Sequence, residues 1–255
     1  MNMEDRRPRV LVVAGFDQSG GAGILADIKT LEAHNVYGYA VCTGMTFQNE
    51  RTITRIQWYG EKDIFEQIDL CFETGLFEVA KIGVAQHMGM LGAIIGHLKQ
   101  HNPAIRIVLD PVIRASSGKD FWEGADRDGF DRLARECWLV TPNWDEIGWL
   151  YPGEDIPEVS RRLSGLCNLY LKGGHHPQQP GRDYVWSGGM LQVLEPGVEK
   201  VYEKHGSGCV LSSSLAANNA WGLPLPEAAV QSKRYIEQFL NSNKTNLGWH
   251  RQLKR

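Results

Sequence analysis

The sequence predicts an α/β fold in which one mostly parallel sheet is covered by helices on both faces. Short apolar segments of strand type alternate with helical patterns along the whole chain of 255 residues. These strand segments lack a polar alternation, which is typical of strands buried on both faces. Because no repeat, low-complexity linker or change of composition divides the chain, residues 1–255 are predicted to form a single domain.

In the first half of the chain, length and apolar spacing distinguish strands from helices. Residues 9–14 form a short, mostly apolar strand that ends at Gly15. A helix is expected from about Gly23, because the apolar residues that follow recur every three or four positions. Further strands are predicted at 39–47, 79–84 and 105–110, and further helices at 64–72 and 91–98.

The second half continues the alternation and ends in two helices. Residues 184–186 and 190–194 flank a Ser-Gly-Gly turn and are typical of a hairpin, which would add antiparallel strands at one edge of the sheet. The last two helices are expected at 208–220 and 226–240. The other predicted elements are a helix over 130–135, a strand over 138–141, a short helix from near Asn143 and a strand over 168–172.

Composition and charge restrict the class of protein. A net charge of −3 without a basic block disfavours a nucleic-acid partner, and no segment approaches the ~20 apolar residues of a membrane span. The five cysteines are odd in number, widely spaced and without a Cys-x-x-Cys pair. This pattern favours reduced thiols in a cytoplasmic protein over a disulfide framework or a structural metal site.

The most informative segment is the glycine-rich turn at residues 205–209, which leads into a helix from about Gly208. Such a turn directs unpaired backbone N–H groups and the positive end of the helix dipole toward one point, where a phosphate would bind. The same field is expected to lower the pKa of Cys209 and favour its thiolate, which indicates group transfer. The alternative is a simple turn followed by a small packed cysteine.

A second glycine-rich segment follows the first strand at residues 14–23. It is not a phosphate loop, because Gly21 stands where that motif requires lysine. Gly21-x-Gly23-x-x-Ala26 formally matches a dinucleotide fingerprint, so a nicotinamide enzyme remains an alternative, although about six residues separate the match from the strand. Asp27, early in the following helix, is expected to accept hydrogen bonds from a ligand.

Polar side chains follow strand after strand of the predicted sheet, where ligands collect in folds of this kind. Gln48 suits the edge of a heterocycle, while Asp110 and Lys172 suit phosphate chemistry. Asn143 and Glu146 lie one helical turn apart and would position Mg²⁺ through water, unless they only form a capping box. Carboxylates, a lysine and a glycine-rich helix start together predict phosphoryl transfer.

The assembled motifs resemble the hydroxymethylpyrimidine/phosphomethylpyrimidine kinases of thiamine biosynthesis, a branch of the ribokinase-like superfamily. The resemblance covers residues 10–240 and its motifs are specific in combination. They are the glycine-rich segment through Asp27 at 14–27, Gln-Asn at 48–49, Lys-Ile-Gly at 81–83, Leu-Asp-x-Val at 109–112, Thr-Pro-Asn-x-x-Glu at 141–146, Lys-Gly-Gly-His at 172–175 and His-Gly-Ser-Gly-Cys at 205–209.

This resemblance implies a ribokinase-like three-layer αβα sandwich, an active homodimer, and ATP with Mg²⁺ as phosphoryl donor. It implies that the pyrimidine pocket is lined by Gly15, Ala22, Asp27, Gln48, Val84 and Val112. It places Asp110, Asn143 and Lys172 at the nucleotide, Glu146 at the metal, and Gly206, Ser207 and Gly208 in an anion hole. Cys209 takes the position of the aspartate base of related sugar kinases. A pyridoxal kinase and a non-catalytic pyrimidine sensor remain alternatives.

Overall fold

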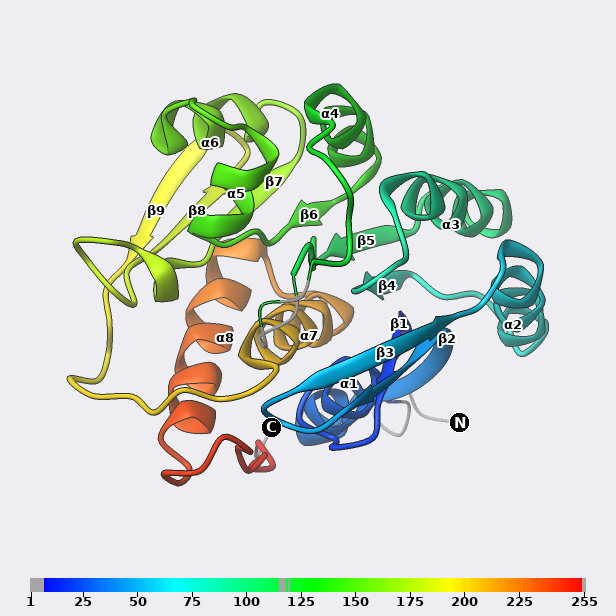
Figure 1. Ribbon diagram of the computed structural model, residues 1–255, viewed down its shortest axis with the longest axis horizontal. Helices are drawn as coiled ribbons and strands as arrows, with labels where there is room; N and C mark the ends of the chain where they lie inside the picture. Colours follow the sequence, from blue (N-terminus) through cyan, green and yellow to red (C-terminus); the bar gives the residue numbers. More distant parts are fainter. Residues whose placement is uncertain (1–6, 115–117, 119, 254–255) are drawn as a thin grey trace.

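The computed structural model describes residues 7–114, 118 and 120–253, and these form a nine-stranded sheet between two layers of helices (Figure 1). The strand order is β3-β2-β1-β4-β5-β6-β7-β8-β9. From β2 to β7 neighbouring strands are parallel, whereas β3, β8 and β9 pair antiparallel at the two edges. The predicted parallel sheet and its hairpin at one edge are therefore confirmed.

The strands are short in the centre and longer toward one edge. Residues 10–14 are almost fully buried, because strands in the middle of such a sheet are covered on both faces. The strands are β1 (Arg9–Asp17), β2 (Tyr37–Gln48), β3 (Ile53–Trp58), β4 (Val79–Ile82), β5 (Arg106–Leu109), β6 (Leu139–Val140), β7 (Asn168–Leu171), β8 (Asp183–Ser187) and β9 (Met190–Leu194).

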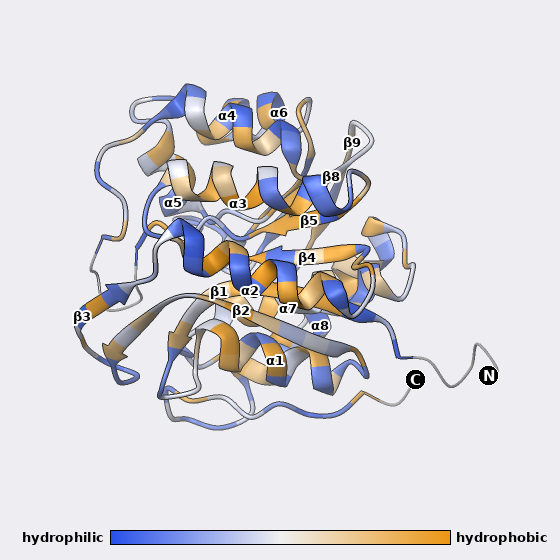
Figure 2. Ribbon diagram, turned by 90° about the vertical axis from the view of Figure 1, so that its right-hand side faces the viewer, coloured by the Kyte–Doolittle hydropathy of each residue, from blue (hydrophilic) through white to orange (hydrophobic). Residues whose placement is uncertain are grey.

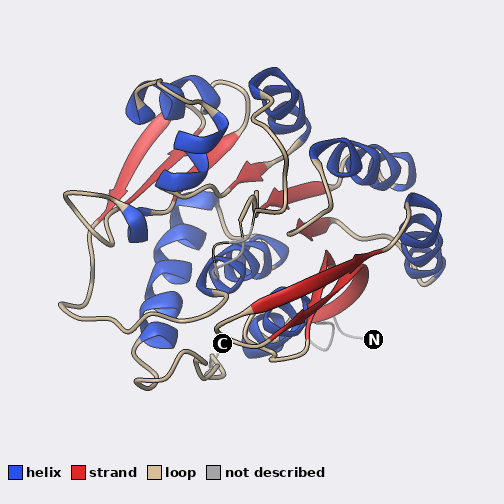
Figure 3. Cartoon of the chain, in the orientation of Figure 1, coloured by secondary structure: helices blue, strands red, loops and turns tan. Residues whose placement is uncertain are grey.

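The helices pack in two groups, one on each face of the sheet (Figure 3). One face carries α1 (Gly23–Ala33), α7 (Ser207–Ala220) and α8 (Leu225–Leu240). The other face carries α2 (Glu61–Glu73), α3 (Met88–His101), α4 (Arg127–Glu136), α5 (Trp144–Leu150) and α6 (Ile156–Leu163). A 3₁₀ turn, η2 (Gly173–His175), follows β7.

Each face of the sheet has its own apolar core, and alternate residues of a strand point into opposite cores. Leu11 and Val13 of β1 face the α2–α6 layer, whereas Val10 and Val12 face α1, α7 and α8. Figure 2 shows the hydrophobic strands β4 and β5 enclosed between helices. This is the predicted three-layer αβα sandwich.

Two elements escaped the sequence prediction, β3 and α6. The apolar residues of β3 do not alternate, and the strand is largely exposed at the edge of the sheet. Helix α6 has only eight residues, with Asp155 as its N-cap and Val159 and Leu163 buried. Among the described residues, no helix is both long and apolar enough to span a membrane. All five cysteines are free thiols.

Candidate active site

A cavity of about 660 Å³ lies at the carboxyl ends of the parallel strands, where polar side chains from most of the sheet converge. It brings together nearly all of the residues that the sequence singled out. Those that line it are Gly15, Ala22, Gln48, Val84, Asp110, Val112, Asn143, Glu146, Lys172, Gly206, Ser207, Gly208 and Cys209. The expectation that these distant segments meet in one place is fulfilled.

The start of α7 forms one end of this cavity. Gly206 is the N-cap of the helix and has φ +75°, a backbone conformation that favours glycine. A Cβ atom at Gly206 would overlap the carbonyl oxygen of Gly21, so the two glycine-rich segments are in direct contact. The first N–H groups of α7, which have no hydrogen-bond acceptor within the helix, therefore lie directly beside the loop that follows β1. An anion placed at this point would face these unpaired N–H groups.

The loop after β1 is held in shape by Asp17. Its carboxylate accepts hydrogen bonds from Ser19 N (2.9 Å), Ser19 Oγ (2.8 Å) and Ala22 N (2.9 Å), and lies 2.9 Å from His205 Nε2. Burial would raise the pKa of Asp17, but the hydrogen bonds of His205 and Ser19 outweigh it and lower the pKa to about 2. Asp17 and His205 thus connect the two glycine-rich segments through a charge that persists at neutral pH.

Lys172 and Asp110 form an ion pair next to the first turn of α7. Lys172 Nζ lies 2.7 Å from Asp110 Oδ1 and 3.5 Å from Glu146 Oε2. A Cβ atom on Gly208 would come within 3.3 Å of Lys172 Nζ, so the small residue lets the ammonium approach the helix start. Burial would lower the pKa of Lys172, but the charges of Asp110 and Glu146 outweigh it and keep the pKa above its ordinary value. The ammonium is therefore charged and faces the cavity.

Asn143 and Glu146 form the capping box that the sequence offered as an alternative. Asn143 Oδ1 accepts from Glu146 N (2.8 Å), and Glu146 Oε2 accepts from Asn143 N (2.7 Å). Both residues also line the cavity, so the structural role does not remove them from the site. Burial raises the pKa of Glu146 to about 7, because it outweighs the nearby Lys172 charge and Asp110 adds repulsion. This carboxyl would release its proton to solvent when a cation binds beside it.

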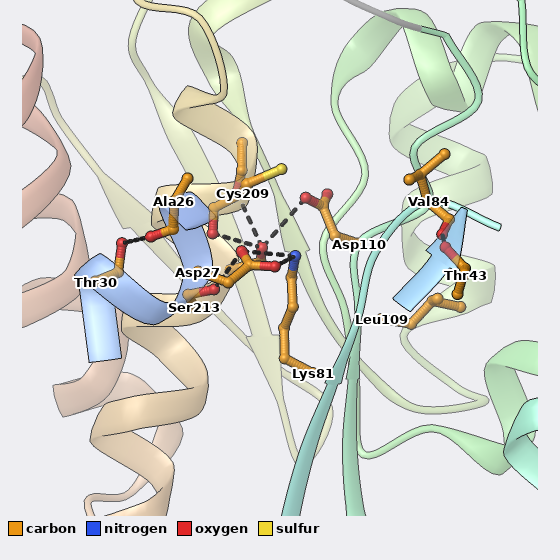
Figure 4. Close-up of polar contacts among 12 residues, drawn as sticks. Ala26, Asp27, Thr30, Thr43, Lys81, Val84, Leu109, Asp110, Cys209 and Ser213 are labelled. Atoms are coloured by element: carbon orange, nitrogen blue, oxygen red, sulfur yellow. Dashed lines mark hydrogen bonds and ion pairs between the residues drawn. The ribbon is translucent and has the colours of Figure 1, made fainter. Parts of the chain in front are cut away.

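Asp27 does not line the cavity, which corrects the prediction that it contacts a ligand. Its side chain is fully buried, and its two oxygens lie 2.9 and 2.8 Å from Lys81 Nζ. Ser213 Oγ donates a third hydrogen bond at 2.7 Å. Figure 4 shows Asp27, Ser213 and Lys81 pointing toward one another beside Asp110 and Cys209. Every oxygen of Asp27 is engaged within the protein, and Lys81 is the member of the pair that reaches the cavity.

Cys209 lies in the first turn of α7 and lines the cavity, as expected. The prediction that its pKa is lowered is wrong. Burial raises the pKa to about 12, and the nearby carboxylates of Asp27 and Asp110 oppose the favourable effect of Lys81. Desolvation of a thiolate therefore outweighs the charge of Lys81 at this position, and Cys209 is a neutral thiol at physiological pH.

The other wall of the cavity is mainly apolar. Gly15 at the end of β1 lies against Val84, since a Cβ atom on Gly15 would approach Val84 Cγ1 to 2.8 Å. Val84 is fixed in turn by Thr43, whose Oγ1 donates to its carbonyl oxygen at 2.7 Å (Figure 4). Val112 and the amide of Gln48 complete a surface suited to a flat polar heterocycle.

Lys81 and Asp17 are site residues that the sequence places within motifs but to which it assigns no role. Lys81 had a visible signal, because it is the one charged residue within the otherwise apolar strand Val79–Ile82. A lysine buried in the middle of a sheet requires a buried partner, and that partner is Asp27. The role of Asp17 depends on the path of the loop, which the sequence does not reveal.

Comparison with known proteins adds independent observations. A hydroxymethylpyrimidine/phosphomethylpyrimidine kinase from Rhizobium meliloti (strain 1021) is 33% identical over 242 residues, covering 91% of this chain and 90% of the relative. The crystal structure of phosphomethylpyrimidine kinase from Clostridium difficile 630 has a TM-score of 0.76 at 28% identity and covers 90% of this chain and 98% of that one.

A pyridoxal kinase from Staphylococcus aureus in complex with AMP-PCP and pyridoxal has a TM-score of 0.79 and covers 95% of this chain and 92% of that one. Its identity is only 21%, so this likeness shows the shared fold alone. The family described as phosphomethylpyrimidine kinase matches residues 17–253, nearly the whole chain. Sequence, fold and relatives agree, and the chain belongs to the phosphomethylpyrimidine kinase family.

Proposed function

We propose that this chain transfers the γ-phosphoryl group of ATP to the hydroxyl group of 4-amino-5-hydroxymethyl-2-methylpyrimidine, and a second phosphoryl group to the resulting monophosphate, in thiamine biosynthesis. One observation carries this proposal. A single cavity joins the Lys172 ammonium, which lies at the N-terminus of α7, to an apolar wall bearing the Gln48 amide. The first suits a phosphoryl group and the second suits a pyrimidine ring.

In the proposed reaction the hydroxyl oxygen forms a bond to the γ-phosphorus while the bond from that phosphorus to the bridging oxygen breaks, and ADP leaves. The transition state is loose, so positioning and charge stabilisation supply most of the acceleration. Lys172 and the backbone N–H groups at the start of α7 face the oxygens of the moving group. They are held by the protein before substrate arrives, so little reorganisation is needed.

Cys209 contributes to this reaction as a thiol. With a pKa of about 12 it is protonated at neutral pH and is not a preformed base. A loose transition state leaves little covalent chemistry for the protein and does not require a strong base. Cys209 therefore orients the substrate hydroxyl by hydrogen bonding and keeps its own proton. The hydroxyl proton passes to an oxygen of the transferred phosphoryl group as the new O–P bond forms, so no thiolate base is needed.

The residues of the cavity also fit Mg²⁺, which accompanies ATP in phosphoryl transfer. The donors are the carboxylate oxygens of Glu146 and Asp110, which are the hard ligands that Mg²⁺ prefers, usually with several waters. The pKa of Glu146 is raised because burial and the charge of Asp110 outweigh the single positive charge of Lys172. A cation bound beside Glu146 would therefore be stabilised by this carboxylate. When bound, the ion would neutralise charge on the nucleotide phosphates, and Glu146 would hold it.

An ADP-release assay tests the proposed function. We expect ATP-dependent turnover with the hydroxymethylpyrimidine and with its monophosphate, and much weaker turnover with pyridoxal. A strong preference for pyridoxal would make the chain a pyridoxal kinase, and no ADP release with any of the three compounds would favour a pyrimidine-binding protein without catalysis. Binding of NAD(P) without any response to ATP would support a nicotinamide enzyme instead.

We also propose that the chain acts as a single kinase domain and as a homodimer. The support for one domain is that the cavity draws its lining from both ends of the chain, from Ala14 to Asn246. The support for a dimer is the family resemblance. Sedimentation of the purified protein tests the dimer, and a purely monomeric species that retains full activity would contradict it.

A further inference from the structure

Three side chains on the surface of the α2–α6 layer converge on one point, away from the residues that line the cavity. His97 and His101 lie four residues apart on α3, so both imidazoles project from the same face of the helix. Asp69 projects from α2. Its Oδ1 atom lies 2.7 Å from His97 Nε2 and 2.7 Å from His101 Nε2. One carboxylate oxygen and two imidazole nitrogens therefore face one another.

The two imidazole rings are held in place by aromatic contacts. His97 stacks on Phe65 with ring centroids 4.0 Å apart and an interplanar angle of 3°. His101 stacks on Phe72 with centroids 4.4 Å apart and an angle of 10°. Both phenylalanines belong to α2, the helix that carries Asp69. Little side-chain freedom remains to be lost when a ligand binds, because the rings already have fixed orientations.

The charge around the cluster favours a cation. The sequence of α2, from Glu61 to Glu73, contains five carboxylates and one lysine. Asp69 is half exposed, while the side chains of His97 and His101 are 15% and 30% exposed. An ion can therefore reach the site from solvent, and the donor atoms need no rearrangement of the core to become accessible.

We propose that Asp69, His97 and His101 form a binding site for a divalent transition-metal ion of the Zn²⁺ or Ni²⁺ type, which links α2 to α3. The three ligand atoms lie within 4.8 Å of one another, a spacing that a single ion can bridge with small side-chain movements. Imidazole nitrogens suit these ions, whereas Mg²⁺ and Ca²⁺ require sets of oxygen ligands. Two histidines four residues apart on a helix are a recurrent arrangement for binding such ions.

Binding requires the Nε2 atoms of both imidazoles to be free of protons. The ring protons then reside on Nδ1, and the metal replaces the two hydrogen bonds to Asp69 with three coordination bonds. The fourth position remains for water, as in zinc sites with three protein ligands. Because the ion binds a pair of helices that the unfolded chain does not hold together, it stabilises the folded state.

Titration calorimetry with Zn²⁺ or Ni²⁺ alone tests the proposal on the whole chain. We expect saturable binding of one ion at this site. Asp69→Asn and His101→Phe are each expected to weaken it by at least about tenfold, a typical loss when the shell of a metal site is damaged. His101→Phe keeps an aromatic ring against Phe72, so it removes the nitrogen while preserving the stacking. Circular dichroism confirms that both variants fold.

Glu66→Gln is the matched control, because Glu66 is an exposed carboxylate on the same helix and is outside the cluster. It is expected to bind the ion as the unchanged protein does. Zn²⁺ is also expected to raise the melting temperature of the unchanged protein and of Glu66→Gln, with reversal by EDTA, but not that of His101→Phe.

Two results would overturn the metal site. One is the absence of saturable binding in the unchanged protein. The other is binding in the Asp69→Asn and His101→Phe variants that is as tight as in the unchanged protein. That result would place the ion at thiols or other histidines. Kinase activity is not part of this test, since these residues do not line the cavity, and failure of the proposed function would leave the metal measurements unaffected.

Discussion

Lys172 Nζ and Asp110 Oδ1 lie 2.7 Å apart at the point where α7 begins. Both side chains are nearly buried, so each charge depends on the other before any ligand arrives. An incoming phosphoryl group would share Lys172 with Asp110, and the Lys172 ammonium is thus held in position before the ligand binds.

Replacing Lys172 with methionine is expected to lower kcat by about 10² or more, because one fixed charge facing the moving group is lost. The ADP-release assay measures this effect. Lys62→Met on the exposed face of α2 is the control for loss of a positive charge and is expected to retain full activity. Similar turnover in the two variants would show that Lys172 serves only to neutralise Asp110.

Cys209 variants distinguish a thiol from a thiolate. If the neutral thiol orients the substrate, Cys209→Ser is expected to keep turnover within about tenfold, while Cys209→Ala loses more because it cannot form the hydrogen bond. If Cys209 acts as a thiolate base, turnover is instead expected to fall by about 10² or more in both variants. Steady-state rates from pH 6 to pH 9 provide a second readout. If the rate of the unchanged protein rises with pH and that of Cys209→Ser does not, the result would support a thiolate base.

Gly206→Ala tests the contact between the two glycine-rich segments. A Cβ atom there would overlap Gly21, so the start of α7 must shift and both activity and stability should fall. Gly222→Ala is a close control, because Gly222 also has positive φ (+82°) but its Cβ would meet nothing within 4 Å. The control is expected to lose about 1 kcal/mol from its backbone conformation alone. Equal losses of stability in urea unfolding would contradict a specific role for the contact.

The raised pKa of Glu146 predicts proton release when Mg²⁺ binds with nucleotide. The carboxyl is partly protonated at a pH near its pKa of about 7, and a bound cation favours the charged form and lowers that pKa. The affinity for Mg²⁺ with nucleotide should therefore increase as the pH rises from 6 to 8. Calorimetry in buffers of different ionisation enthalpy measures the released proton. Glu146→Gln should abolish that release, and an unchanged release would assign the proton to another group.

The buried pair of Asp27 and Lys81 predicts a large, non-additive effect on stability. Asp27→Asn or Lys81→Met alone leaves one buried charge without its partner, which costs about 3–5 kcal/mol. The double variant leaves no such charge and should be more stable than the sum of the two losses implies. Urea unfolding of the four proteins gives the coupling energy. Additive losses would show that the two charges do not interact.

The parts of the fold that the sequence revealed are those with a strong apolar pattern. Strands such as 9–14 and helices such as 208–220 are long or strongly apolar, so local spacing defines them. Strand β3 is different, because its residues are half exposed and its existence depends on pairing with β2. The same holds for α6, which is stabilised by packing Val159 and Leu163 on the sheet.

The site shows the same division between local and distant information. Which residues meet could be predicted, since parallel strands place their ends together. The protonation and burial of those residues could not be predicted. The helix dipole at Cys209 is local and visible in the sequence. The burial that raises the pKa of Cys209, and the charges of Lys81, Asp27 and Asp110 around it, come from distant parts of the chain. The position of Asp27 outside the cavity likewise depends on Lys81, which lies 54 residues away along the chain.

The hydrogen-bonded group of Asp27, Lys81 and Ser213 has a consequence for how this enzyme tolerates change. It connects α1, β4 and α7, and its short polar distances allow far less sliding between elements than apolar packing does. The position of the second turn of α7 relative to α1 and β4 is therefore fixed by this hydrogen bond from Ser213 to the buried ion pair. Conservative repacking of the surrounding aliphatic layer should alter melting behaviour while leaving catalytic alignment intact.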